Sequence, residues 1–150
     1  MLIRGYSIDV TDPPWPYYLD AVRIDGVEVS PKQVEFYGPV SLALVYEANG
    51  GTLHAKCGSG WVVLIPRDPA LQWPPFERAV PCNSADNYEV RAVRPGDYYA
   101  LELAWDSGAG VLWVFAGKLT EHVLNQASKV TVRPGESIAA DVRAIAEPPY

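Results

Sequence analysis

The chain has 150 residues, of which 49% are hydrophobic, and a formal net charge of −6. This length allows one domain or two small ones with a packed core. The negative charge and the lack of any Lys/Arg run argue against nonspecific binding to nucleic acid or to anionic membranes. No apolar stretch reaches the roughly 18 residues of a membrane-spanning helix.

The first elements in chain order are short strands interrupted by proline. Residues 2–10 alternate loosely between apolar and polar, and the prolines that follow end the strand because they lack a ladder donor. The alternation resumes over residues 17–24. Strict alternation along this segment predicts Leu19 on one face and Val22 on the other.

A tight turn and two further strands follow. Asp25-Gly26 predicts a hairpin. Residues 33–37 and 40–46 predict two strands, before Asn49-Gly50-Gly51 marks a candidate domain boundary. Along the second of these strands, one face carries four apolar residues: Val40, Leu42, Leu44 and Tyr46.

Beyond the boundary, strand signals recur at short intervals. Six segments read as strands, at residues 52–57, 61–65, 78–82, 88–93, 98–105 and 111–115. Residues 66–75 read as a long loop, and residues 119–127 carry the helical signal of this part. Two further segments, 129–132 and 137–145, are predicted to form a closing hairpin around Pro134-Gly135. Many short strands with frequent turn signals predict an all-β, antiparallel sandwich with one short helix.

Four segments beyond the boundary carry a family resemblance, at residues 50–53 (GGTL), 61–66 (WVVLIP), 88–98 (YEVRAVRPGDY) and 130–136 (VTVRPGE). In their order, they resemble the carboxypeptidase regulatory-like domain, a transthyretin-like β-sandwich of bacterial secreted and surface proteins. In the most specific segment, Pro95 presets φ and Gly96 can take a positive φ at the turn. The resemblance implies a complete transthyretin-like, Ig-like sandwich over residues 50–150. Residues 1–49 resemble the C-terminal half of a preceding sandwich, which would leave strand edges and an apolar face to be covered.

The two cysteines, Cys57 and Cys82, admit two interpretations from the residues alone: a disulfide or two buried thiols. The resemblance favours the disulfide, because the family has valine or threonine near these positions and both have become cysteine together. A disulfide implies an oxidising compartment. We therefore expect an extracellular, cell-surface or periplasmic protein, although the first residues lack the form of a signal peptide.

No set of residues predicts an active site, a cofactor or a metal. His54 and Cys57, with Cys82 and His122, are potential zinc ligands, but His54 and Cys57 should point to opposite faces of one strand. Gly58-Ser59-Gly60 lacks the strand–turn–helix context of a nucleophile elbow. We expect a protein that is not an enzyme.

Aromatic residues beside the proline-rich loops are the candidate contact surface. They are Trp15, Tyr17, Tyr18, Trp73 and Phe76. Such residues can form a sugar-stacking or protein-contact surface, or they can anchor loops to the core.

The expected function is a structural or interaction module of an extracellular or surface assembly. Its partners would be copies of itself or neighbouring domains, and strand complementation between copies would build a filament. The alternative is a carbohydrate- or peptide-binding accessory domain excised from a larger surface protein. Neither hypothesis involves nucleic acid or a membrane span.

Overall fold

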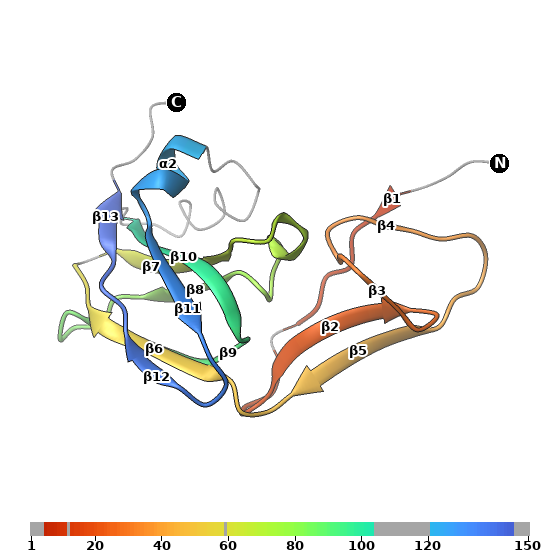
Figure 1. Ribbon diagram of the computed structural model, residues 1–150, viewed down its shortest axis with the longest axis horizontal. Coiled ribbons are helices and arrows are strands. Elements are labelled where there is room, and N and C mark those ends of the chain that lie inside the picture. The colour runs from red at the N-terminus through yellow and green to blue at the C-terminus, as the bar shows by residue number, and fades with distance from the viewer. Residues whose placement is uncertain (1–4, 12, 59, 104–120, 146–150) are drawn as a thin grey trace.

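The computed structural model describes residues 5–11, 13–58, 60–103 and 121–145 (Figure 1). Its described part consists mainly of β-strands in several sheets, with a short α-helix, α2 (Glu121–Gln126), and a 3₁₀ turn, η1 (Pro69–Leu71). The predicted all-β, sandwich-like class with one short helix near residues 119–127 is therefore confirmed. The strand expected at residues 111–115 lies outside the described residues.

The larger sheet is built around two central strands. Its hydrogen-bonded order is β11–β10–β7–β8, with antiparallel neighbours. The bounds are β7 (Trp61–Pro66), β8 (Arg78–Pro81), β10 (Gly96–Leu103) and β11 (Ser128–Val132). A further strand, β13 (Arg143–Ile145), runs parallel to the last residues of β10.

The smaller sheet has the order β12–β6–β9. Its strands are β6 (Gly51–Lys56), β9 (Asn87–Val93) and β12 (Ser137–Ala139). β9 is antiparallel to β6, whereas β12 is parallel to it. β8 is an edge strand of the larger sheet, and β9 is an edge strand of the smaller sheet. Because β8 and β9 contact each other, these two edges lie on the same side of the sandwich.

The main core lies between these two sheets. It contains these buried residues of the facing strands: Leu53, Val62, Leu64, Tyr88, Val90, Val93, Tyr98, Ala100 and Val132. The opposite face of the larger sheet is also buried, with Val63, Ile65 and Leu101 packed together and Leu124 of α2 against them. β7 is thus covered on both faces, which explains its uninterrupted apolar sequence.

The described residues before Gly50 form two small sheets of their own. One has the order β3–β2–β5, built from β2 (Tyr18–Ile24), β3 (Val27–Val29) and β5 (Leu42–Glu47). The other pairs β1 (Gly5–Tyr6) with β4 (Val34–Glu35). In Figure 1 these strands extend to one side of the sandwich. The division into domains at residues 49 and 50 stays a prediction.

The β2–β3 hairpin turns at the predicted Asp25-Gly26, where both residues have positive φ, 50° and 81°. The predicted faces of β2 were wrong, however. The pairing with β5 shifts register between Leu19 and Ala21, so Leu19 and Val22 join the same buried cluster. A bulge adds one residue to a strand and reverses the alternation beyond it.

That cluster joins the N-terminal sheet to the sandwich. Leu19 and Val22 pack with Phe76, and Leu71 of η1 contacts them. Ser30 Oγ donates a hydrogen bond to the Ala70 carbonyl oxygen at 2.6 Å. The loop before β8 thus makes both apolar and polar contacts with the three-stranded sheet and attaches it to the sandwich.

The predicted closing hairpin is wrong. β11 pairs with β10 in the larger sheet, whereas β12 pairs with β6 in the smaller one. The Pro134-Gly135 turn carries the chain from one sheet to the other, with Gly135 at φ 68° and its N–H donating to the Asn49 carbonyl oxygen at 2.9 Å. In the described part of the chain, no helix is long and apolar enough to cross a membrane.

Candidate functional site

An open cleft lies along the side of the sandwich where β8 and β9 face each other. It has a volume of about 730 Å³. Three parts of the chain line it: the proline-rich segment before β2, the start of β8 with the loop that precedes it, and β9. Trp61, the first residue of β7, lines it as well.

Two exposed aromatic residues stand on the N-terminal side of the cleft. Trp15 is 67% exposed and Tyr17 is 47% exposed. The Tyr17 N–H donates to the Pro14 carbonyl oxygen at 2.9 Å, which closes a tight turn around Trp15. The turn is therefore ordered while both rings remain open to solvent.

The β9 wall of the cleft carries a charged pair. Val90 points into the core, so the alternation of the strand directs Glu89 and Arg91 outward. The Arg91 guanidinium forms an ion pair and hydrogen bond with the Glu89 carboxylate, which lowers the pKa of Glu89. The same guanidinium lies 5.7 Å from the centre of the Trp15 ring, a cation–π distance.

Arg78 links the two edge strands, β8 and β9, through hydrogen bonds. Its guanidinium donates to the carbonyl oxygens of Ala92 at 3.0 Å and Arg91 at 3.1 Å. Because Arg78 belongs to β8 and its acceptors to β9, these bonds link the two sheets.

Glu77, which also lines the cleft, is a buried carboxyl group that the sequence did not single out. Burial raises its pKa to about 7, and the positive charge of Lys32 opposes this shift. The sequence around Glu77 did not predict its burial, because a glutamate in a loop is normally a surface residue. The neighbouring Phe76 packs with Leu19 and Val22 of the N-terminal sheet, a contact that the sequence did not predict.

The structure divides the five candidate contact residues. Trp15 and Tyr17 line the cleft, whereas Tyr18 and Phe76 are buried. Trp73 donates a hydrogen bond from its indole Nε1 to the Ile8 carbonyl oxygen at 3.0 Å, which fastens the N-terminal segment to the loop before β8. Thus Trp73 and Phe76 hold the N-terminal part of the chain to the sandwich. Trp15 and Tyr17 remain available for contact.

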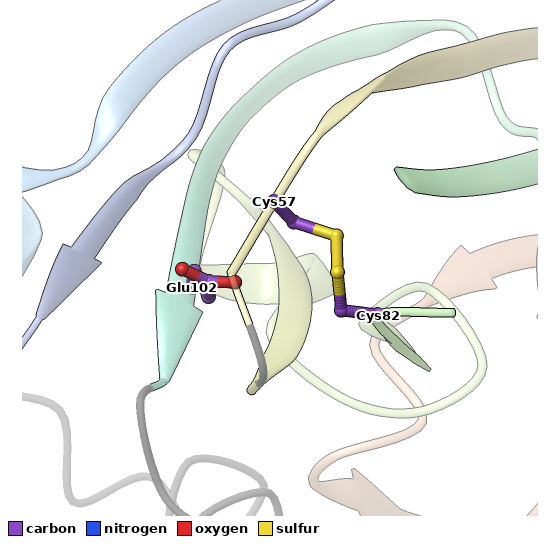
Figure 2. Close-up of side chains that lie close together, drawn as sticks. All are labelled: Cys57, Cys82 and Glu102. Carbon is purple, nitrogen blue, oxygen red and sulfur yellow. A yellow bond between two sulfur atoms is a disulfide. The ribbon is translucent and has the colours of Figure 1, made fainter. Parts of the chain in front are cut away.

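A disulfide joins Cys57 and Cys82, with the Cα atoms 6.0 Å apart (Figure 2). Cys57 follows β6 and Cys82 follows β8, so the bond connects the smaller sheet to the larger one. The disulfide implied by the family resemblance is confirmed, and the interpretation as two free thiols is wrong.

Glu102 lies beside the disulfide, on the core-facing side of β10 (Figure 2). Its carboxylate accepts a hydrogen bond from the Gly58 N–H at 2.5 Å. A carboxylate oxygen and both Sγ atoms lie within 4.8 Å of one another. Cysteine and glutamate are metal-ligand types, but the bonded sulfurs offer no thiolate, which is the form that binds a metal.

His54, which was also considered for chemistry, does not belong to this cluster. His54 is exposed on β6, where it pairs across the strands with Glu89. The His122 side chain and Ser59 lie outside the described residues. The buried Glu102 was missed by sequence reasoning, because its apolar neighbours in β10 gave no sign of a polar contact with the turn after Cys57.

The outer strand of the N-terminal sheet, β5, is exposed. Leu42 is 51% exposed, and Leu44 and Tyr46 are more than one third exposed. Their cross-strand partners in β2, by contrast, are buried: Ile24, Val22 and Leu19. An apolar stripe therefore runs from the interior of the molecule to its free edge.

Comparison with family models, curated proteins and solved structures finds no match to this chain. The resemblance of residues 50–145 to carboxypeptidase regulatory-like domains stays a prediction.

Proposed function

We propose that the protein is a non-enzymatic interaction module that associates with copies of itself through the free edge of β5. The observation that supports this proposal is the exposure of Leu42, Leu44 and Tyr46 on a strand that pairs on one side only. Edge strands of this kind present unpaired N–H and C=O groups that can accept another strand.

The sequence of β5 lacks the devices that usually prevent edge pairing. Its six residues are Leu-Ala-Leu-Val-Tyr-Glu, without proline, lysine or glycine. Proteins commonly protect exposed edges with lysine, proline or a bulge on the edge itself. The bulge in this sheet lies on the β2 side, at Asp20, so it leaves the outer edge of β5 unaltered.

A second copy of β5 is a suitable occupant of this edge. Antiparallel pairing of two β5 strands about a two-fold axis would join two three-stranded sheets into one of six strands. With the axis at Leu44, Leu44 would lie opposite its counterpart and Leu42 opposite Tyr46 of the other copy, which would extend the apolar stripe. A two-fold contact closes into a dimer, so a filament needs a second contact or a donated strand.

The proposed setting is an extracellular, cell-surface or periplasmic assembly. The Cys57–Cys82 disulfide supports it, because such bonds persist mainly in oxidising compartments. The resemblance to domains of bacterial surface proteins supports the same setting. In such an assembly, residues 1–49 would be the part that needs covering by a partner.

Sedimentation velocity over a range of protein concentrations tests the proposal. The wild-type chain should show a concentration-dependent increase in sedimentation coefficient, and Leu44→Lys should remain a monomer. Val27→Lys is the matched control, since Val27 is an exposed apolar residue on the opposite edge strand of the same sheet. A wild-type chain that stays monomeric at its highest soluble concentration would refute self-association.

A further inference from the structure

The cleft between β8 and β9 is independent of the β5 edge, because none of the residues that line it belongs to β3 or β5. We infer that this cleft binds a neutral oligosaccharide. The inference rests on the combination of exposed rings, a charged pair and a hydrogen-bonded wall in one open depression.

The rings of Trp15 and Tyr17 supply stacking surfaces. Exposed aromatic rings leave apolar area in water, and here two of them stand on one ordered turn at the mouth of the cleft. An aromatic face carries partial negative charge, and the C–H groups on the flat face of a pyranose ring carry partial positive charge. A sugar ring stacked on Trp15 would therefore gain both apolar and electrostatic contact.

The polar groups beside these rings suit vicinal hydroxyl groups. Glu89 offers carboxylate oxygens as acceptors, and Arg91 offers guanidinium N–H donors in a fixed plane. Each hydroxyl of a sugar can both donate and accept, so one saccharide can use both side chains. The cation–π contact between Arg91 and Trp15 keeps the donors next to the stacking surface.

The charge balance favours a neutral sugar over an acidic one. Glu89 and Arg91 neutralise each other, and Arg78 is engaged with two carbonyl oxygens of β9. The remaining carboxyl group among the described lining residues is that of Glu77. An anionic ligand would thus meet two carboxyl groups in the cleft, whereas both arginines that line it are already engaged.

The geometry disfavours a peptide added as a strand. Arg78 already donates to the carbonyl oxygens of Arg91 and Ala92, and both of these β9 residues line the cleft. Pro74 and Pro75, which form part of the wall, have no backbone N–H to donate to an incoming strand. These features favour recognition through side chains, which suits saccharides.

Among the described residues, no side chain donates a hydrogen bond to the carboxyl group of Glu77. A buried polar group without a partner is unfavourable, and a ligand hydroxyl that reached it would provide that partner. Glu77 is thus a candidate for contact with the most deeply bound sugar unit.

Isothermal titration and two-dimensional NMR with cellopentaose, xylopentaose and chitopentaose test the inference, with decaproline as the competing ligand class. At least one saccharide should bind and shift the amide signals of β9. Trp15→Ala should weaken that binding by about fivefold or more, the scale of one lost stacking contact. Tyr17→Ala should weaken it as well, whereas Tyr37→Ala should not, since Tyr37 is an exposed aromatic residue outside the cleft.

Three outcomes would overturn the inference. They are the absence of binding by all three saccharides at millimolar concentration, binding that Trp15→Ala leaves unchanged, and decaproline binding in the cleft in place of the saccharides. Trp15 is largely exposed, so its replacement should leave the near-ultraviolet circular dichroism of the core unchanged apart from the signal of the lost indole.

Discussion

Arg94 donates a hydrogen bond from its Nε to the Asp20 carbonyl oxygen at 2.9 Å, and its Nε lies 3.4 Å from the Asp20 carboxylate. Arg94 follows β9 in the sandwich, and Asp20 is the bulged residue of β2. The guanidinium also lies 5.8 Å from the centre of the Phe76 ring. One side chain therefore contacts both the N-terminal sheet and the loop on which that sheet rests.

Arg94→Ala should loosen the N-terminal sheet. The Asp20 carbonyl group would lose a charged donor, and loss of such a contact costs roughly 1–3 kcal/mol. We expect faster hydrogen exchange of the β2 amides, with little change in β7 and β10. Arg133→Ala is the control, because Arg133 is highly exposed and its ion pair with Glu136 spans 3.9 Å. Equal effects of the two substitutions would contradict the assigned role of Arg94.

Reduction of the disulfide should destabilise the sandwich. Cys57 and Cys82 are separated by 25 positions, and closing a loop of this length stabilises a fold by about 3 kcal/mol in the chain-entropy model. The double substitution Cys57→Ala and Cys82→Ala should lower the urea midpoint to the same extent as a reducing agent does on the wild-type chain. A midpoint unaffected by reductant would show that the bond does not constrain the unfolded chain.

Glu77 should make stability depend on pH near neutrality. Burial raises its pKa from the usual 4.5 to about 7, so between these values the folded chain holds a proton that the unfolded chain releases. The free energy of unfolding should therefore fall as the pH rises from 4.5 through 7, by roughly 3 kcal/mol at most.

Glu77→Gln should remove this contribution while keeping the size of the side chain. Urea unfolding at pH 5 and pH 8 should show a smaller difference for this variant than for the wild-type chain. Glu28→Gln, at an exposed position of β3, serves as the control. The assignment fails if Glu77→Gln and the wild-type chain show the same pH dependence.

Local features of this fold could be predicted from the sequence. The Asp25-Gly26 hairpin depends on two adjacent residues that tolerate positive φ, and the central position of β7 follows from its own apolar run. The disulfide could not be derived from spacing alone, and only the family resemblance favoured it.

Features that depend on distant contacts could not be predicted. The bulge at Asp20 arises where β2 pairs with β5 and meets Arg94, so strict alternation placed Leu19 on the wrong face. The closing strands separate because β12 finds its partner in β6, more than eighty residues earlier. Likewise, the burial of Phe76 and the exposure of Trp15 depend on how the two parts of the chain pack. Both residues looked alike in the sequence, each beside prolines.

The central claim is that β5 is the contact edge between copies, and hydrogen exchange of its amides at low and high protein concentration tests it most directly. If two β5 strands pair, the β5 amides that point away from β2 should exchange more slowly at high concentration, and Leu44→Lys should abolish this protection. The amides of β7 should exchange equally slowly at both concentrations, since they lie in the core of the larger sheet. Exchange in β5 that does not change with concentration, or protection that appears only elsewhere, would contradict the account.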